Sequence, residues 1–175
     1  MRVRTFLASL AALLALGAAA ARPAAAGPIS LPPAVYSEEF QEKLTDDYGE
    51  REGVYLREAI ERALVRALAR VGGQVSSEPG VRIETTIIDA RPNRPTFQQL
   101  NDRPGLDFGR SLSIGGAELH AVLRAPDGTA LTEVHHRFYE YDIRNVVALT
   151  TWGDARRSID RFARKVATAY AQVER

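Results

Sequence analysis

Two segments of alternating apolar and polar residues, 117–124 and 131–143, constrain the fold of this chain most. They flank Asp127-Gly128, and an Asp-Gly pair between alternating segments is a strong signal of a β-hairpin with a two-residue turn. A turn at that pair fixes which residues face each other across the two strands. The predicted pairs are Ala117 with Phe138, Leu119 with His136 and Ala121 with Val134 on one face, and Glu118 with Arg137, His120 with His135 and Val122 with Glu133 on the other.

Two longer segments have the residue spacing of amphipathic helices. The first is predicted to begin at Asp47, in a capping box with Glu50, and to end at Gly72-Gly73. The second is predicted to begin at Thr151, with Asp154 three residues later as its partner in a capping box. Apolar residues then recur every three or four positions, which predicts one buried side on each helix. They are Leu56, Ile60, Ala63, Leu64, Ala67, Leu68 and Val71 in the first helix, and Trp152, Ala155, Ile159, Phe162, Ala163, Val166, Tyr170 and Val173 in the second.

A further strand and a long loop lie between the first helix and the hairpin. Residues 81–89 alternate and are rich in β-branched side chains, as in a half-buried strand. Residues 91–112 hold several prolines and glycines and exceed the usual length of a connection, so this loop is expected to be either functional or mobile, with a simple surface excursion as the alternative. The elements therefore occur in the order helix, strand, long loop, β-hairpin, helix. They predict an α+β fold with two layers, in which an antiparallel sheet of three to four strands carries two amphipathic helices on one face.

The first 26 residues have the pattern of a secretory signal peptide. Arg2 and Arg4 precede a short run of Leu and Ala, and three alanines before Gly27 offer a cleavage site. The run is too short to span a bilayer, which needs about 20 apolar residues. Residues 27–45 are predicted to form an extended, proline-containing leader with a candidate edge strand, and residues 46–175 a single α+β domain. We therefore expect a periplasmic or secreted protein with no transmembrane span.

Composition excludes several classes of function. The chain has no cysteine, which removes disulfides, thiol catalysis and the lipid anchor of bacterial lipoproteins. Loss of the signal peptide would remove three arginines and no acidic residue, which leaves acidic residues in slight excess. Nucleic-acid binding depends on neutralising phosphates, so we expect no nucleic-acid partner.

No catalytic or cofactor-binding motif is found, and we predict no catalytic residue and no cofactor. His120 and His135 are weak candidates for metal ligands, with Glu118 or Glu133 as a third ligand. The alternative for this pair is an ordinary exposed surface. His136 is predicted to face the core as a hydrogen-bonded, structural histidine. The candidate acids in strand or loop are Asp89, Asp102, Asp107 and Asp142.

The outer face of the hairpin is the candidate binding surface. Helices on one side of a sheet leave its other side free, and aromatic, arginine and apolar residues together are typical of protein interfaces. The alternative is a solvated antiparallel face, which is normal for such sheets. The predicted partner-binding residues are His120, Val122, Arg124, His135, Arg137, Tyr139 and Tyr141.

Several short motifs between residues 80 and 165 carry a resemblance. They are Arg-Pro-Asn-Arg-Pro-Thr at 91–96, Gln-Gln-Leu at 98–100, Pro-Gly-Leu at 104–106, Ser-Ile-Gly-Gly-Ala-Glu at 113–118, Tyr-Glu-Tyr-Asp at 139–142, Thr-Trp-Gly-Asp-Ala at 151–155 and Asp-Arg-Phe-Ala at 160–163. In these the chain resembles uncharacterised exported proteins of Gram-negative bacteria. Its layout is more loosely similar to small envelope accessory lipoproteins, from which it differs by lacking the lipidated cysteine. The resemblance implies an exported envelope protein and assigns no functional residue.

Together these observations predict a non-enzymatic periplasmic module that binds an envelope protein or a lipid-like ligand through the outer sheet face and loop 91–112. Two alternatives stay open. One is a periplasmic hydrolase or metal-dependent enzyme that uses His120, His135 and acids of the loop. The other is a self-associating structural domain, which would form a homodimer.

Overall fold

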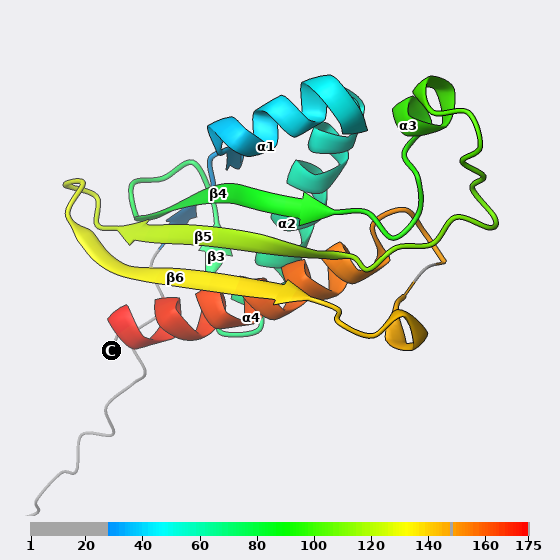
Figure 1. Ribbon diagram of the computed structural model, residues 1–175. Helices are drawn as coiled ribbons and strands as arrows, with labels where there is room; N and C mark the ends of the chain where they lie inside the picture. Colours follow the sequence, from blue (N-terminus) through cyan, green and yellow to red (C-terminus); the bar gives the residue numbers. More distant parts are fainter. Residues whose placement is uncertain (1–27, 148, 175) are drawn as a thin grey trace, which may run out of the picture.

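The computed structural model describes residues 28–147 and 149–174, so the predicted signal peptide lies outside the described residues. They form an α+β fold in which a sheet is covered on one face by two long helices (Figure 1). The strands are β1 Pro28–Ser30, β2 Val35–Tyr36, β3 Gln74–Val75, β4 Val81–Arg91, β5 Gly116–Arg124 and β6 Ala130–Tyr139. The helices are α1 Glu38–Lys43, the π-helix η1 Leu44–Tyr48, α2 Glu50–Ala69, α3 Phe97–Asp102, the 3₁₀ helix η2 Ile143–Asn145 and α4 Gly153–Val173.

The sheet is larger than predicted and is mixed rather than antiparallel. Its six strands follow the order β3-β1-β4-β5-β6, with β2 also paired to β4. β1 and β2 both run parallel to β4, whereas β4, β5 and β6 form an antiparallel meander. The predicted α+β class is therefore confirmed, whereas the predicted antiparallel sheet is found only in part, as the three strands β4, β5 and β6. The extra strands are only two or three residues long, too short for a recognisable period-two pattern.

The segment expected to be an extended leader contributes to the core. Ile29 in β1 is fully buried, and Phe40 and Leu44, which follow in α1 and η1, are fully buried too. The Ser37 hydroxyl accepts the backbone N–H of Phe40 and so caps α1, while its own N–H donates to the Ile87 carbonyl of β4. This stretch is therefore tied to the sheet by backbone and side-chain contacts.

The β-hairpin has the predicted register. All six predicted pairs, from Ala117–Phe138 to Val122–Glu133, lie opposite each other in β5 and β6. The turn is longer than the predicted two residues, because the register shifts near Arg124 and the N–H of Ala125 donates to the carbonyl of Thr129. Gly128 has φ +88°, which suits a turn that closes with a residue in the left-handed region. The six predicted pairs are unaffected, because the register shift lies between Leu123 and Arg124, closer to the turn.

β4 contains a bulge that the alternating pattern does not reveal. Ile87 pairs with Leu119 of β5, but the next pair is Asp89 with Glu118, so Ile88 is an extra residue. Strict alternation would place Asp89 on the same face as Ile87. The bulge moves Asp89 to the outer face and turns Ala90, which is buried, toward the core.

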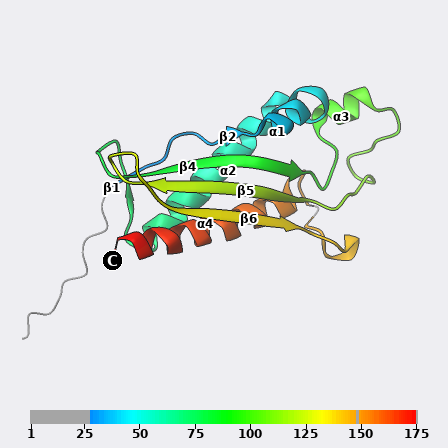
Figure 2. The ribbon, with the colours of Figure 1, turned by 60° about the vertical axis from the view of Figure 1, so that its left-hand side comes forward.

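α2 and α4 pack against each other and cover one face of the sheet (Figures 1 and 2). Their predicted apolar sides are buried except at Val71, because α2 ends at Ala69, before the predicted end at Gly72-Gly73, and Val71 is exposed. The largest fully buried side chains of the core include Trp152, Phe162 and Tyr170. None of the helices in the described part of the chain is both long and apolar enough to cross a bilayer.

Both predicted helix starts are wrong, because the acidic residues have other partners. α2 is preceded by Gly49 at φ +98° and not by Asp47, whose carboxylate accepts the Gln99 amide at 3.0 Å and pairs with Arg103 at 2.7 Å. α4 begins after Trp152 without a capping box. Asp154 is fully buried, and its contacts to a distant loop are described below.

Candidate functional site

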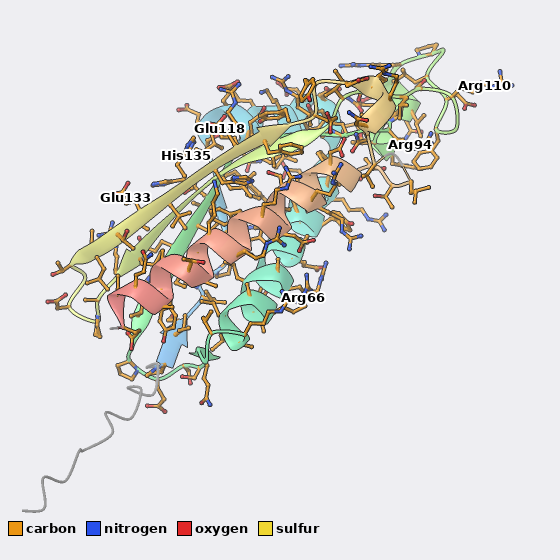
Figure 3. All side chains as sticks on the ribbon, turned by 90° about the horizontal axis from the view of Figure 1, so that it is seen from below. Arg66, Arg94, Arg110, Glu118, Glu133 and His135 are labelled. Carbon is orange, nitrogen blue, oxygen red and sulfur yellow. The ribbon has the colours of Figure 1, made fainter. Side chains whose placement is uncertain are left out.

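The predicted partner-binding residues of β5 and β6 share the outer face of the sheet. His120, Val122 and Arg124 alternate with the buried residues of β5, and their partners across the hairpin face the same way. In Figure 3, Glu118, His135 and Glu133 lie along these strands on the side away from α4. Tyr141 follows β6 and is 86% exposed. The structure therefore brings the predicted residues of the two strands together on one surface.

The two outward histidines bind separate carboxylates. The Nε2 atom of His120 lies 3.1 Å from Glu133, and that of His135 lies 2.9 Å from Glu118. Glu118 is also 3.5 Å from Arg137. Within residues 28–147 and 149–174, no group of three or more His, Cys, Asp or Glu side chains is arranged to hold a metal ion. On this face each outward histidine therefore contacts one carboxylate across the hairpin.

The bulge in β4 builds a second polar cluster on the same face. Tyr139 donates its hydroxyl to Asp89 at 2.7 Å, and Lys43 reaches the other oxygen of Asp89 at 3.0 Å. The ring of Tyr139 lies between two guanidinium groups, Arg91 at 4.8 Å and Arg137 at 5.5 Å from its centroid. Burial and the neighbouring Asp89 carboxylate raise the pKa of Tyr139 well above its usual value. Tyr139 therefore acts as a hydrogen-bond donor and not as a base.

His136 faces the core as predicted and is 6% exposed. Its Nε2 atom is buried and has no hydrogen-bond partner among the described residues, so the predicted hydrogen bond is not found at that nitrogen. Burial, followed by the nearby Lys165 and Arg161 charges, lowers the pKa of His136.

The long loop is ordered by polar contacts rather than being a simple surface excursion. Thr96 and Gln99 form a capping box at the start of α3. Arg94 donates to the carbonyl oxygens of Phe108 at 2.6 Å and Gly109 at 3.0 Å, with its guanidinium 5.5 Å from the Phe108 ring. The side chains of Arg94 and Gln99 thus hold the loop in a compact conformation. From the sequence alone, this segment is recognised only as a run of turn-forming residues.

Asn93 joins both ends of this loop to the start of α4. Its amide donates to Asp154 at 2.6 Å and to the Ser113 carbonyl at 3.2 Å, and it accepts the Asp154 N–H at 2.8 Å. Asn93 and Asp154 are both completely buried. The carboxylate of Asp154 also accepts the N–H of Val147 at 3.1 Å and faces Arg157 at 3.3 Å. This network fixes the base of the loop.

A cleft of about 330 Å³ opens between the two arms of the loop. Its walls combine arginine and apolar side chains, and Arg91 connects it to Tyr139 on the sheet face. The lining residues are Tyr48, Arg91, Pro92, Asn93, Arg94, Pro95, Gln99, Arg103, Leu106, Ser111, Leu112, Ser113 and Ile114.

Large apolar side chains are exposed around this end of the molecule. Phe97 on α3 is 74% exposed, and Leu149, which precedes α4, is 90% exposed. α3, the rest of the loop and η2 all lie beyond the same end of the β4–β6 meander (Figures 1 and 2). We call the loop-end surface the exposed residues here: Phe97, Phe108, Leu112, Ile114, Tyr141, Ile143 and Leu149.

Two candidate acids, Asp107 in the loop and Asp142 after β6, have structural contacts of their own. The Asp107 carboxylate accepts the backbone N–H groups of Gly109 and Arg110, each at 2.8 Å. Asp142 binds Arg144 at 2.6 Å, and this guanidinium lowers the pKa of Asp142. These two carboxylates therefore stabilise turns.

The loop-end surface and the arginines of the neighbouring cleft together are suited to binding a partner with apolar and anionic groups. The exposed rings would contact apolar groups, and the guanidinium groups would bind anionic ones.

No protein-family model matches the sequence, and no curated protein matches it either. Among solved structures, the chain is similar to a minor lipoprotein from Acinetobacter baumannii, with 13% identity and a TM-score of 0.40 over 83% of this chain and 92% of that one. It is also similar to a PelC dodecamer from Paraburkholderia phytofirmans, with 10% identity and a TM-score of 0.46 over 83% of this chain and 86% of that one. At these values both likenesses concern the course of the chain only, and neither assigns a functional residue.

Proposed function

We propose that this protein is a non-catalytic binding module of the cell envelope that docks onto a partner protein through the loop-end surface and the adjoining part of the sheet face. The observation that carries this proposal is the exposure of aromatic and aliphatic side chains at the end of the molecule that holds the 330 Å³ cleft, two of which, Leu112 and Ile114, line that cleft. Contiguous apolar surface rimmed by polar groups marks interaction sites in proteins that are otherwise polar outside.

The contacts that hold the loop in one conformation support a role in docking. Asn93 and Asp154 hold its base, the Thr96–Gln99 capping box holds α3, and Arg94 holds the turn at Phe108. A surface that is already ordered loses less conformational entropy on binding. The exposed rings are therefore presented in a fixed arrangement before a partner arrives.

Charge favours a partner segment that combines apolar and acidic residues. Residues 91–112 hold four arginines, Arg91, Arg94, Arg103 and Arg110, and two aspartates. From outside the segment, Asp89 pairs with Arg91 at 3.6 Å and Asp47 pairs with Arg103 at 2.7 Å. Arginine is enriched among the residues that dominate binding energy at interfaces, and it binds carboxylates through two parallel hydrogen bonds. Because Arg91 lies over Tyr139, a partner in the cleft would also reach the aromatic end of the predicted sheet-face site.

The periplasm is the proposed location, on the basis of the signal-peptide pattern of residues 1–26. Cleavage of that segment would leave the residues of the described fold intact. Mass spectrometry of the protein from the producing cell, with osmotic-shock fractionation, tests both points. An N-terminus near Gly27 in the released fraction is expected, and an uncleaved chain in the cytoplasmic fraction would contradict this location.

The docking proposal is tested by a matched pair of double variants. Phe97→Ser with Phe108→Ser removes two exposed rings from the loop-end surface, whereas Val65→Ser with Val71→Ser removes two exposed side chains elsewhere. Envelope proteins that copurify with the tagged wild-type protein are expected to be lost only with the first pair. Equal retention by both pairs would exclude the loop-end surface as the contact.

The sheet-face contribution is tested separately with Tyr139→Ala and Tyr141→Ala. We expect weaker copurification, because Tyr139 holds Arg91 at the edge of the cleft. Unchanged copurification would restrict the contact to the loop.

The two alternative functions have direct tests as well. Light scattering at high concentration tests self-association. Comparing the hydrolase activity of the double variant His120→Ala with His135→Ala with that of the wild type tests the enzyme.

A further inference from the structure

A second cleft, remote from the loop in sequence, lies where β6 meets α4. It has a volume of about 470 Å³ and contains no acidic side chain. The residues lining this α4 cleft are His136, Arg161, Arg164, Lys165, Thr168, Ala169 and Gln172. Those on the helix are separated by three or four positions, which places them along one side of α4 beside β6.

The cations of this cleft lack the carboxylate partners that several other basic residues of the described fold have. On α2, Arg62 pairs with Glu58 at 3.1 Å, and on the sheet Arg124 pairs with Glu84 at 2.8 Å. Among residues 28–147 and 149–174, by contrast, no ion pair is found for the three basic residues of the α4 cleft. They are Arg161, Arg164 and Lys165, of which Arg161 lies over the Phe138 ring at 4.1 Å. Three neighbouring positive charges therefore meet no negative charge in the described fold.

A buried polar group points to the same place. His136 lines the cleft with only 6% of its surface exposed, and its buried Nε2 atom has no hydrogen-bond partner in the described residues. Leaving such a group without a partner is unfavourable, and buried polar side chains are rarely left so. An anion held between the helix cations would supply acceptor atoms next to this imidazole.

We propose that the α4 cleft is a binding site for a phosphate group, held by Arg161, Arg164 and Lys165 with His136 at its inner wall. Guanidinium groups bind phosphate oxygens in pairs, and the lysine ammonium adds a compact charge. A phosphate group is the chemistry shared by free inorganic or sugar phosphates and by anionic phospholipid headgroups. This inference goes beyond the docking function and uses none of the residues of the loop-end surface.

The pKa of His136 can be measured with and without phosphate. It should change if phosphate binds beside the ring, and it should not change if His136 has only a structural role. Burial is the largest cause of the lowered pKa of His136, and the nearby Lys165 and Arg161 charges of α4 lower it further. The adjacent His135, which points to the opposite face of β6, adds a smaller effect in the same direction. A bound phosphate would offset those charges, so phosphate should raise the pKa of His136 toward the ordinary histidine value. By linkage, phosphate should also bind more tightly as the pH falls through that range.

The test is an NMR titration of the histidine side chains of the full mature protein with inorganic phosphate, at constant ionic strength. We expect a saturable shift of the His136 signals and a raised His136 pKa. Arg161→Gln with Lys165→Gln should weaken binding by about tenfold or more, since two charged contacts are lost. The control, Arg62→Gln in α2 with Arg70→Gln directly after it, makes the same change of net charge and should leave the affinity within about twofold.

A second arm identifies the source of the phosphate group. Vesicles of phosphatidylglycerol and of phosphatidylcholine are mixed with the wild type and with the cleft variant. Binding only to phosphatidylglycerol, lost in the cleft variant, supports a headgroup, and saturation by inorganic phosphate alone supports a small phosphate. No His136 response to either probe, or equal weakening in the α2 control, would overturn the proposal. Trp152 fluorescence checks that each variant is folded, and Arg164→Gln is the second variant if the double variant is not.

Discussion

Asn93→Ala should be among the most destabilising single substitutions outside the apolar core. The side chain is completely buried and makes three hydrogen bonds, two with Asp154 and one with Ser113. Loss of the bond to the carboxylate costs about 2 kcal/mol and loss of each neutral bond about 1 kcal/mol, so about 4 kcal/mol in all. That is a large part of the stability of a typical domain, which is about 5–15 kcal/mol.

Urea unfolding measures this loss directly, because Trp152 is the only tryptophan and is buried beside the network. With a slope of about 2 kcal/mol per M, the unfolding midpoint should fall by about 2 M with the slope unchanged. Asn101→Ala, at an exposed position of α3, is the matched control and should change stability by no more than about 0.5 kcal/mol.

A double-mutant cycle with Asp154→Ala tests the physical reason. If the contacts with Asp154 cause the loss, the two substitutions should be strongly non-additive, with a coupling energy above about 1 kcal/mol. A loss below about 1 kcal/mol for Asn93→Ala, or additive effects of the two substitutions, would refute this account of how the loop is anchored.

Three further predictions concern other contacts. Gly153→Ala should destabilise by about 3 kcal/mol in urea unfolding, because its Cβ would lie 1.6 Å from the Val147 carbonyl oxygen. Tyr139→Phe should cost about 1.5 kcal/mol by the same assay, since Asp89 loses a donor at 2.7 Å. The lowered pKa of His136 means that its neutral form favours folding, so stability is full above the ordinary histidine pKa and falls at lower pH. The loss of unfolding free energy between about pH 7.5 and 5.5 should therefore be smaller in His136→Gln.

The first two of these predictions have their own controls. Gly72→Ala has open space around the added methyl group and tests only the backbone, at φ +85°, so it should cost less than Gly153→Ala. Tyr141→Phe, on an exposed ring, should be silent beside Tyr139→Phe. Equal effects within any pair would contradict the corresponding contact.

The elements with a long, regular pattern could be predicted from the sequence. The alternation on both sides of Asp127-Gly128 gave the hairpin register, because a slip of one residue would expose every apolar side chain of the strands. The apolar sides of α2 and α4 could be predicted because apolar residues recur every three or four positions over several helical turns. The outward placement of His120 and His135 followed from that register.

Features that depend on distant partners could not be predicted in this way. Asp47 and Asp154 have the local pattern of helix caps, yet their carboxylates bind Gln99 and Asn93 from the loop. The bulge at Ile88 leaves no trace in the alternation and decides that Asp89 meets Tyr139. The cleft of the loop arises from such long-range contacts, and the sequence signal for it was only the unusual length of segment 91–112.

Site-specific photocrosslinking in the producing cell tests the docking proposal most directly. A photoreactive phenylalanine analogue replaces Phe108 in the loop-end surface, and in separate strains Val65 on α2 or His135 on the sheet face. The proposal predicts a discrete adduct with one envelope protein from position 108, lost when Phe97→Ser is added, and none from position 65. An adduct from position 65 as strong as that from position 108, or no adduct from 108, would contradict it.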